Sequence, residues 1–432
     1  LEKNPNFRGE AYPSEGEPGD EEAGLLVDAG QVMPFIDKVV FSLEKENIPY
    51  WNKFLQGYYD SSGIGSDSFD QAVNISGGGD ATLTEEMQQR GIDLLTTVAT
   101  STYYGGFNML DPVVGGDSER ARLLRRAIAI TVDYEEYIAI FSNGRGIPGQ
   151  GPIPPGIFGY EEGETGINRY VYDVVNGRAQ RKSIEEARAL LAKAGYANGI
   201  DQSSGKPLLL HYDTPAVGPA AKATLDWWRK QFKKLNIQLV IRSTDYNRFQ
   251  QKMRDGKAQI FGWGWNADYP DPENFLFLLY GPNKKAQLNG ENAANYANAK
   301  FDKLFETMKN LPNGQKRRTV IKEMIDIARK DGPWLWGFHP KVFSLQHEWL
   351  KNTKPADIAN NTLKYKRVDP LMREQRRAEW NTAILWPVYL LLLLLAMVVA
   401  PAFVAYKKRQ RAAALSSNSA SVTLIKPTRI DI

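Results

Sequence analysis

The hydrophobic and polar residues of this chain follow two different periods, which predict strands and helices in turn. Short apolar runs bounded by Gly, Pro or polar residues are typical of strands. Longer stretches with apolar residues at every third or fourth position are typical of amphipathic helices. The pattern predicts strands at 37–43, 208–212, 237–242 and 259–265, and helices at 51–57, 117–142 (one helix or a pair), 219–235, 246–255, 299–310 and 314–330.

A helix start is visible at residues 183–186. Ser183 is a preferred N-cap residue, and Glu186 follows three positions later, where its carboxylate can reach back to the N-cap amide. The predicted helix continues through EEARALLAKA and ends at Gly195, a residue that favours helix termination.

The order of elements indicates the fold class. Strand 208–212, helix 219–235 and strand 237–242 form a β-α-β unit, whose two strands we expect to be parallel. Further helices and strands follow without an internal repeat. We therefore predict an α/β fold with mixed sheets covered by helices.

An uncharged stretch lies near the C-terminus. No charged residue occurs between Glu379 and Lys407, and 390–395 are six consecutive Leu. The apolar residues 383–405 would span about 34 Å as a helix, against about 30 Å for the hydrocarbon core of a bilayer. We predict a transmembrane helix at 381–406. Lys and Arg flank it on both sides, so the positive-inside rule does not decide its orientation.

The N-terminal region carries a second compositional signal. Residues 10–32 contain seven Asp and Glu among Gly and Pro, with no basic residue, and are predicted to be a solvated loop or insertion. Leu1 is neither an initiator Met nor the start of a signal peptide. We expect the chain to begin within a longer protein.

Composition excludes several classes of function. Hydrophobic residues make up 42% and charged residues 24%, so wholesale disorder is excluded. The net charge of +4 comes without a basic stripe, which disfavours nucleic-acid binding. The chain has no Cys, and its three His (211, 339 and 347) lack metal-ligand spacing. Because no nucleophile–base–orienter set is visible, we expect neither an enzyme nor a cofactor or metal.

The most specific stretch is 260–283, which reads IFGWGWNADYPDPENFLFLLYGPN. A buried-type strand enters a loop rich in Trp, Asp and Pro, and a helix opens near Pro272. This stretch resembles the ligand-binding loop of the family 5 extracytoplasmic solute-binding proteins, which serve oligopeptide and dipeptide ABC importers. Supporting blocks occur in the family's order at 4–8, 103–112, 123–138, 144–160, 295–306 and 331–335.

The resemblance covers residues 1 to about 380 and implies a type II periplasmic-binding-protein fold, of which this chain is the C-terminal portion. It also implies that residues 1–100 form a middle portion of domain I, that 101–338 form domain III, and that the chain returns to domain I at 339–380. The membrane helix at 381–406 departs from the usual family pattern, and 407–432 would be a cytoplasmic tail. The first part of domain I and all of domain II are absent.

The resemblance also implies site residues. The family's Trp-x-x-Asp element falls on Trp265 and Asp268, which would hold the α-ammonium group of a peptide through a charge-assisted hydrogen bond and cation–π attraction. Alternatively, Asp268 caps the turn at Asp271. Trp263 and Tyr104 would line the cleft, or belong to the core. Trp227, Trp228, Trp334 and Trp336 are interpreted as packing residues.

By resemblance, the chain captures peptides outside the cytoplasmic membrane and delivers them to the permease and ATPase subunits of an ABC importer. Its partners would be the peptide, those subunits and the upstream N-terminal half of the protein. The body would be extracytoplasmic (periplasmic) on a single-pass membrane anchor. Alternatives are another solute (oligosaccharide, opine or chelated nickel) or a structural or sensory ectodomain that has lost transport. A motif of the form GxGxxG at 144–149 contains Pro148 and opens no helix, so it does not indicate dinucleotide binding.

Overall fold

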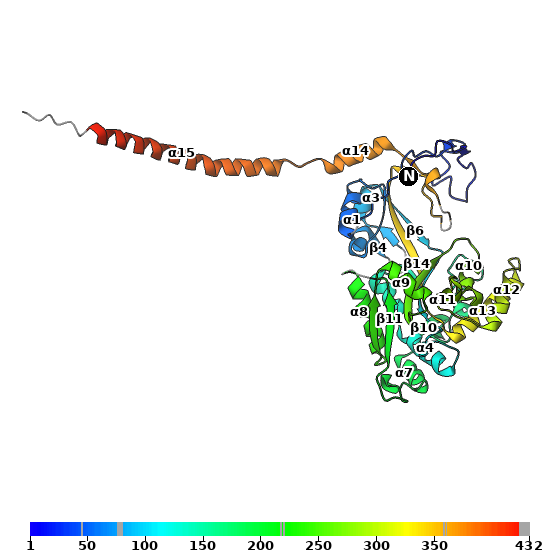
Figure 1. Cartoon of the computed structure of the whole chain (residues 1–432). Coiled ribbons are helices and arrows are strands. Elements are labelled where there is room, and N and C mark those ends of the chain that lie inside the picture. Colours follow the sequence, from blue (N-terminus) through cyan, green and yellow to red (C-terminus); the bar gives the residue numbers. More distant parts are fainter. Residues whose placement is uncertain are drawn as a thin grey trace, which may run out of the picture. The chain divides into compact units, whose positions relative to one another are not determined.

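A computed structural model describes residues 1–44, 46–75, 81–216, 218, 221–356, 359 and 361–422 (Figure 1). The chain divides into two compact units, residues 1–370 and 371–432. Each unit is described by itself below.

The first unit is built on a mixed sheet with strand order β12-β11-β13-β7-β14-β3, with β6 and β8 also paired to β14. Strand β11 runs parallel to β12 and β13, and every other pair in the sheet is antiparallel. The strands are β3 Ser61–Gly63, β6 Ile92–Val98, β7 Ser101–Phe107, β8 Gly146–Pro148, β11 Leu209–Thr214, β12 Gln238–Ser243, β13 Ile260–Asn266 and β14 Trp334–His347.

The predicted β-α-β unit is confirmed. Strands β11 and β12 pair in parallel from Leu209 opposite Gln238 to Thr214 opposite Ser243, and helix α8 (Lys222–Lys233) connects them. The first residues of the predicted helix, 219 and 220, lie outside the described residues.

Helices cover both faces of the sheet. Because side chains alternate along a strand, neighbouring residues of β13 enter different cores: Ile260 packs with α4, α7 and α8, and Phe261 packs with α9, α10, α12 and α13. Figure 1 shows α7 and α8 away from α12 and α13. The helices are α4 Glu119–Thr131, α5 Tyr134–Phe141, α7 Ile184–Lys193, α9 Tyr246–Arg254, α10 Glu273–Leu276, α12 Ala299–Met308 and α13 Gln315–Asp331. The predicted capping box of Ser183 and Glu186 is present.

Strand β14 links two parts of the sheet. Its first residues, Trp334 to Phe338, pair with β7, and its last, Lys341 to His347, pair with β6. A third hydrophobic cluster lies around the second part and includes Phe54 of α1 (Asn47–Leu55), Met87 of α3 (Glu85–Gln89) and Leu345. Smaller elements are β1 Glu10–Ala11, β2 Val32–Met33, α2 Phe69–Ala72, β4 Val73–Ile75, β5 Ala81–Leu83, α6 Gly163–Gly166, β9 Tyr172–Val175, β10 Arg178–Arg181, α11 Lys285–Leu288, β15 Leu350–Lys351 and β16 Arg367–Val368.

Two expectations for the N-terminal region need correction. The prediction of a strand at 37–43 is wrong. Of these residues, only Lys38 pairs with another segment, in an isolated bridge to Glu2. The stretch 10–32 consists mostly of turns, as predicted, yet it is not fully solvated. Asp28 is buried, and its carboxylate accepts hydrogen bonds of 2.7 Å from both Asn352 and Arg367. These hydrogen bonds connect the acidic residues 10–32 to the part of the chain near β16.

The second unit is helical. Helix α14 (Pro370–Asn381) leads to α15 (Trp386–Val422), which contains Pro401. Within the part of the chain that the structure describes, one helical stretch, Pro370–Leu415, is long and apolar enough to cross a membrane, and none of its apolar window is buried. This length and composition agree with the prediction for 381–406.

Candidate functional site

A cavity of about 560 Å³ is lined by residues of strands β7, β11 and β13. Helices α5, α8 and α9 complete its wall. Aromatic rings dominate the lining, and they come from segments far apart in the sequence: Tyr103, Tyr104, Tyr134, Tyr137, Tyr212, Trp228, Tyr246, Phe249, Trp263 and Phe338.

Two glycines of β13 make room for rings that line this cavity. Gly262 and Gly264 lie on the face of the strand opposite to Trp263. A β-carbon at Gly262 would lie 2.5 Å from the hydroxyl oxygen of Tyr212, and one at Gly264 would lie 2.6 Å from the ring of Tyr103. The Gly-Trp-Gly sequence therefore lets the rings of Tyr212 and Tyr103 lie against one side of β13, while Trp263 contributes to the lining from the other side.

The cavity is uncharged. Its described lining includes no Asp, Glu, Lys, Arg or His, and its polar side-chain groups are hydroxyls, the indole N–H groups of two Trp and the amide of Asn266. Burial raises the pKa of the Tyr134 and Tyr212 hydroxyls above the ordinary value, so both stay protonated at neutral pH. Such a surface offers stacking and neutral hydrogen bonds to a ligand.

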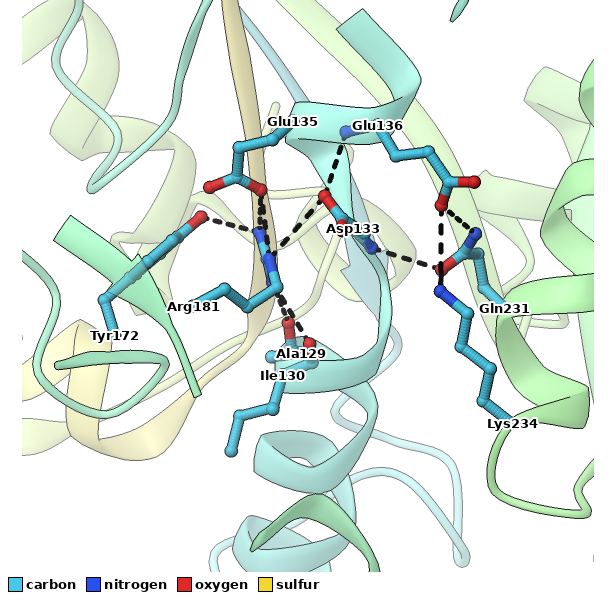
Figure 2. A network of polar contacts seen from close by, with 9 residues as sticks. All are labelled: Ala129, Ile130, Asp133, Glu135, Glu136, Tyr172, Arg181, Gln231 and Lys234. Carbon is cyan, nitrogen blue, oxygen red and sulfur yellow. Dashed lines mark hydrogen bonds and ion pairs between the residues drawn. The ribbon is translucent and has the colours of Figure 1, made fainter. Parts of the chain in front are cut away.

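A polar network holds Tyr134 in place (Figure 2). Arg181 donates to Oε2 of Glu135, at 2.6 and 3.0 Å, and to the carbonyl oxygens of Ala129 and Ile130, at 2.9 and 3.3 Å. Asp133 caps α5 by accepting a bond from the amide of Glu136. Because Arg181 satisfies carbonyls at the end of α4 and pairs with the first turn of α5, the network fixes the turn that carries Tyr134.

The second half of this network connects α5 to α8. Buried Gln231 donates to Oε2 of Glu136 at 2.9 Å and accepts from Nζ of Lys234 at 2.7 Å (Figure 2). Both helices contribute cavity residues, such as Tyr137 and Trp228. The network therefore stabilises the relative position of two cavity walls.

Two of the four predicted site residues line the cavity. Tyr104 is almost fully buried, and its ring stacks on Trp334 with 3.5 Å between centroids. Trp263 is half-buried, stacks on Phe249 and lies 5.5 Å from Nζ of Lys285. Both residues pack against the core as well, so the two readings of them are compatible. Their contact with a ligand stays a prediction.

The other two, Trp265 and Asp268, lie beyond the cavity lining and meet at Asn274. The side-chain oxygen of Asn274 accepts from the indole nitrogen of Trp265 at 3.2 Å and from the amide of Asp268 at 2.8 Å. Its amide nitrogen donates to the exposed Asp268 carboxylate at 3.3 Å. Asn274, which sequence reasoning missed, therefore organises the loop, and the anchoring role of Asp268 stays a prediction.

Asp271 forms the turn that follows. Its Oδ1 accepts from the amide of Glu273 at 2.9 Å, at the start of α10. Asp271 thus makes one hydrogen bond of this turn, and the alternative turn role of Asp268 stays a prediction.

Several cavity residues could not be identified from the sequence. Tyr212, Tyr137 and Tyr246 read as ordinary core or surface residues, and Trp228 was interpreted as packing alone. Trp228 is buried, stacks on Tyr212 with centroids 4.5 Å apart, and also lines the cavity. The available signal was the high aromatic content, which does not locate a site. Within the described residues, no group of three or more His, Cys, Asp or Glu is arranged to hold a metal.

Comparison with known proteins identifies the family. The model described as "Bacterial extracellular solute-binding proteins, family 5 Middle" matches residues 1–287. The chain is 27% identical to heme-binding protein A of Haemophilus influenzae, over 51% of this chain and 37% of the relative. It is 25% identical to di/tripeptide-binding protein 4 of Pseudomonas aeruginosa (54% and 40%), and 24% identical to the dipeptide-binding protein of Escherichia coli (61% and 45%). The chain thus spans less than half the length of these relatives.

Solved structures support the fold. The periplasmic binding protein DppA of Helicobacter pylori, in complex with peptide STSA, superimposes with a TM-score of 0.61 at 18% identity, over 77% of this chain and 57% of that chain. AppA of Bacillus subtilis, in complex with a nonapeptide, gives 0.60 at 16% identity, over 79% and 62%. At this identity the likeness shows the type II periplasmic-binding-protein fold. Because the family model matches well over half of the sequence, the chain belongs to the bacterial extracellular solute-binding proteins of family 5.

Proposed function

We propose that this chain is part of the peptide-binding component of an ABC importer. The observation that carries the proposal is the uncharged aromatic cavity on β7, β11 and β13, in a chain of a solute-binding family. In this view the protein captures short peptides outside the cytoplasmic membrane and delivers them to permease and ATPase subunits.

The chemistry of the cavity fits the neutral parts of a peptide. Burying an ion without a partner costs several kcal/mol or more, and no charged side chain in the described lining would offset that cost. An aromatic or aliphatic side chain would instead stack on rings such as Trp228 and Tyr246. Backbone amides would bond to groups such as Thr214 and Asn266.

The charged end of the peptide needs a partner outside the cavity. Asp268 follows the cavity residue Asn266 by two positions, and its exposed carboxylate accepts a hydrogen bond from Asn274. We propose that this carboxylate binds the α-ammonium group of the peptide and that Trp265 lies beside the resulting ion pair. Asn274 would then hold the carboxylate in the orientation that the ammonium needs.

The remaining assignments extend the same proposal. Residues 1–100 and 339–380 would belong to domain I and 101–338 to domain III, with a membrane anchor at 381–406 and a cytoplasmic tail at 407–432. The body would lie outside the membrane. A polypeptide that supplies the rest of the solute-binding fold would provide the opposing wall of the cleft.

Fluorescence titration of the purified 432-residue chain in detergent tests the ligand class. Trp228 and Trp263 line the cavity, so the dipeptide Ala-Phe should change the Trp emission saturably. Without the opposing wall, saturation should need concentrations of about a millimolar or more; saturation at micromolar peptide would show that these residues hold a complete site. Trp228→Phe should reduce the change, whereas Trp386→Phe, in α15, should not.

The same titration separates the alternatives. One solved relative holds nickel with histidine, and another relative is named as a heme-binding protein. Saturation by a nickel–histidine complex or by maltotriose, but not by Ala-Phe, would replace the peptide with another solute. No response to any of the three, even when the opposing wall is supplied, would favour a sensory or structural ectodomain. The observation that favours such an ectodomain is the apolar helix at the C-terminus.

A further inference from the structure

A small pocket, separate from the aromatic cavity, is lined by basic side chains. It has a volume of about 10 Å³, and its residues come from α4, from the loop before β9 and from the junction of α13 with β14. None of them lines the aromatic cavity. The described lining includes no Asp or Glu. We call it the basic pocket, after its five cationic residues Arg122, Arg125, Arg126, Arg329 and Lys330.

Only part of this positive charge is balanced by nearby carboxylates. Arg122 pairs with Asp331 at 3.2 Å, and a nitrogen of Arg329 lies 3.6 Å from an oxygen of Asp326. Among the described residues, the other three cations make no ion pair; they are Arg125, Arg126 and Lys330. The pocket therefore carries an excess of positive charge.

Burial makes this excess unfavourable for the folded chain. Arg125 is 1% exposed and donates only to carbonyl oxygens, at 2.7 to 3.1 Å, so its hydrogen bonds supply no negative charge. Burial lowers the pKa of Arg125 to about 10, and it also lowers the pKa of Arg126 and that of Arg329. Because a buried charge without a counter-charge destabilises the folded state, an anion in the pocket would offset this cost.

Arg126 has N–H groups to offer to such an anion. Its guanidinium carbon lies 4.4 Å from the centre of the Tyr170 ring, and it makes no hydrogen bond within the described residues. Contact with the face of a ring orients a guanidinium without using its N–H groups. Lys330 is exposed, so a ligand can reach its ammonium group from solvent.

Two buried side chains of the lining add neutral donors. The side-chain oxygen of Asn168 accepts from the amide of Tyr170 at 3.1 Å, whereas its side-chain nitrogen makes no hydrogen bond in the described part of the chain. Trp334 is 1% exposed, and its buried indole nitrogen has no hydrogen-bond partner there either. Buried N–H groups without an acceptor are uncommon in folded proteins. The pocket thus combines excess positive charge with donors that the described residues leave unused.

We propose that the basic pocket binds a phosphate group, either as the free ion or as the monoester of a small molecule. Its volume admits a group of about the size of one oxygen, so one phosphate oxygen would enter the pocket beside Arg126 and the others would stay accessible to Lys330. A phosphate dianion suits several unbalanced cations better than a carboxylate, which carries a single charge. The proposal does not depend on the peptide assignment, because the basic pocket and the aromatic cavity share no residue.

Equilibrium dialysis of the purified chain in neutral detergent tests the site, with radiolabelled inorganic phosphate at an ionic strength held constant by sodium chloride. Uptake should saturate at about one phosphate per chain, because the volume admits a single oxygen-sized group. Arg126→Gln and Lys330→Gln should each weaken binding at least about tenfold, since each removes a charged donor. Lys330 is exposed, so its variant keeps the proposal testable if Arg126→Gln does not fold.

Arg120→Gln is the matched control. Arg120 also lies on α4 and over a tyrosine ring, 4.5 Å from the centre of Tyr196, but it pairs with Asp201 and is not part of the pocket lining. This variant removes the same charge and should leave phosphate binding unchanged. Absence of saturable uptake at millimolar phosphate would overturn the proposal. Equal losses in Arg120→Gln and Arg126→Gln would do the same.

Competition for the bound label separates the two sources of a phosphate group. Displacement by glycerol 3-phosphate as well as by unlabelled phosphate would support a site for phosphate monoesters. Displacement by unlabelled phosphate but not by glycerol 3-phosphate would support a site for the free ion. Equal displacement by acetate would contradict the preference for a phosphate group.

Discussion

Arg317 and Asp271 form a bidentate ion pair, with each of the two nitrogen–oxygen distances at 2.7 Å. The side chain of Arg317 is only 5% exposed and lies on α13, whereas Asp271 forms the turn between β13 and α10. The pair therefore fixes the loop that carries Asp268 to the helical layer of the body.

Removing the acidic partner should destabilise the protein. In Asp271→Asn the buried guanidinium of Arg317 loses its counter-ion, which costs about 3–5 kcal/mol for a fully buried pair. Because Asp271 itself is partly exposed, we expect about 1–3 kcal/mol in the free energy of unfolding, measured in urea. Asp226→Asn is the control, since Asp226 pairs with Arg229 on an exposed face, and it should change stability by less than about 1 kcal/mol. Equal effects of the two variants would contradict this reading.

The same pair predicts a pH dependence. Burial raises the pKa of Asp271, but the hydrogen bonds from Arg317 and from the amide of Glu273 outweigh it, so the pKa lies below its ordinary value of 3.8. A carboxyl with a depressed pKa adds stability above its unfolded pKa and loses that contribution as the pH falls through the folded pKa. The stability difference between the wild type and Asp271→Asn should therefore be constant from about pH 5 to 7 and shrink below about pH 4. A difference that persists unchanged at pH 2 would point to a cause other than the ion pair.

Filling the cavity should remove ligand binding and spare the fold. In Gly264→Val the new side chain meets the ring of Tyr103, which is 42% exposed and can move into the cavity. We expect at least about tenfold weaker binding of Ala-Phe, or about 1.4 kcal/mol. Gly63→Val is the matched control, because Gly63 lies on β3 with open space around its β-carbon. Unchanged binding in Gly264→Val would show that the cavity is not part of the binding site.

The anchoring role of Asp268 is tested by two ligands, in the protein complemented by its opposing wall. Asp268→Asn keeps the shape of the side chain and removes its charge. Losing one partner of a desolvated charge pair costs about 2–5 kcal/mol, so a free peptide should bind roughly 30- to several-thousand-fold more weakly in calorimetry. An N-acetylated peptide has no ammonium and should lose far less. Equal losses for both peptides would assign Asp268 to the turn and its Asn274 bond alone.

Membrane topology gives a further prediction. If 381–406 span the membrane with the body outside, protease added to intact spheroplasts should digest the body and spare a tag attached after Ile432. Lysis of the spheroplasts should expose the tag and serves as the control. Loss of the tag with survival of the body, before lysis, would reverse the orientation.

Elements that depend on neighbouring residues could be predicted from the sequence. The capping box at Ser183 and the paired helices α12 and α13 follow from contacts within one or two helical turns. The strand predicted at 37–43 shows the limit of this reasoning. Its composition favours a strand, but a strand exists only when a partner supplies hydrogen bonds, and beyond Val39 the described residues supply none.

Local sequence patterns were enough to predict the α/β class, the apolar C-terminal helix and the loop after β13, because periodicity, length and turn residues are local properties. The sequence also singled out Trp263 and Tyr104. That Tyr134, Tyr212 and Trp228 join them around one cavity could be seen only in the folded chain. These rings come from α5, β11 and α8, which meet because sheet pairing and helix packing bring distant segments together, and no local pattern encodes which faces will meet.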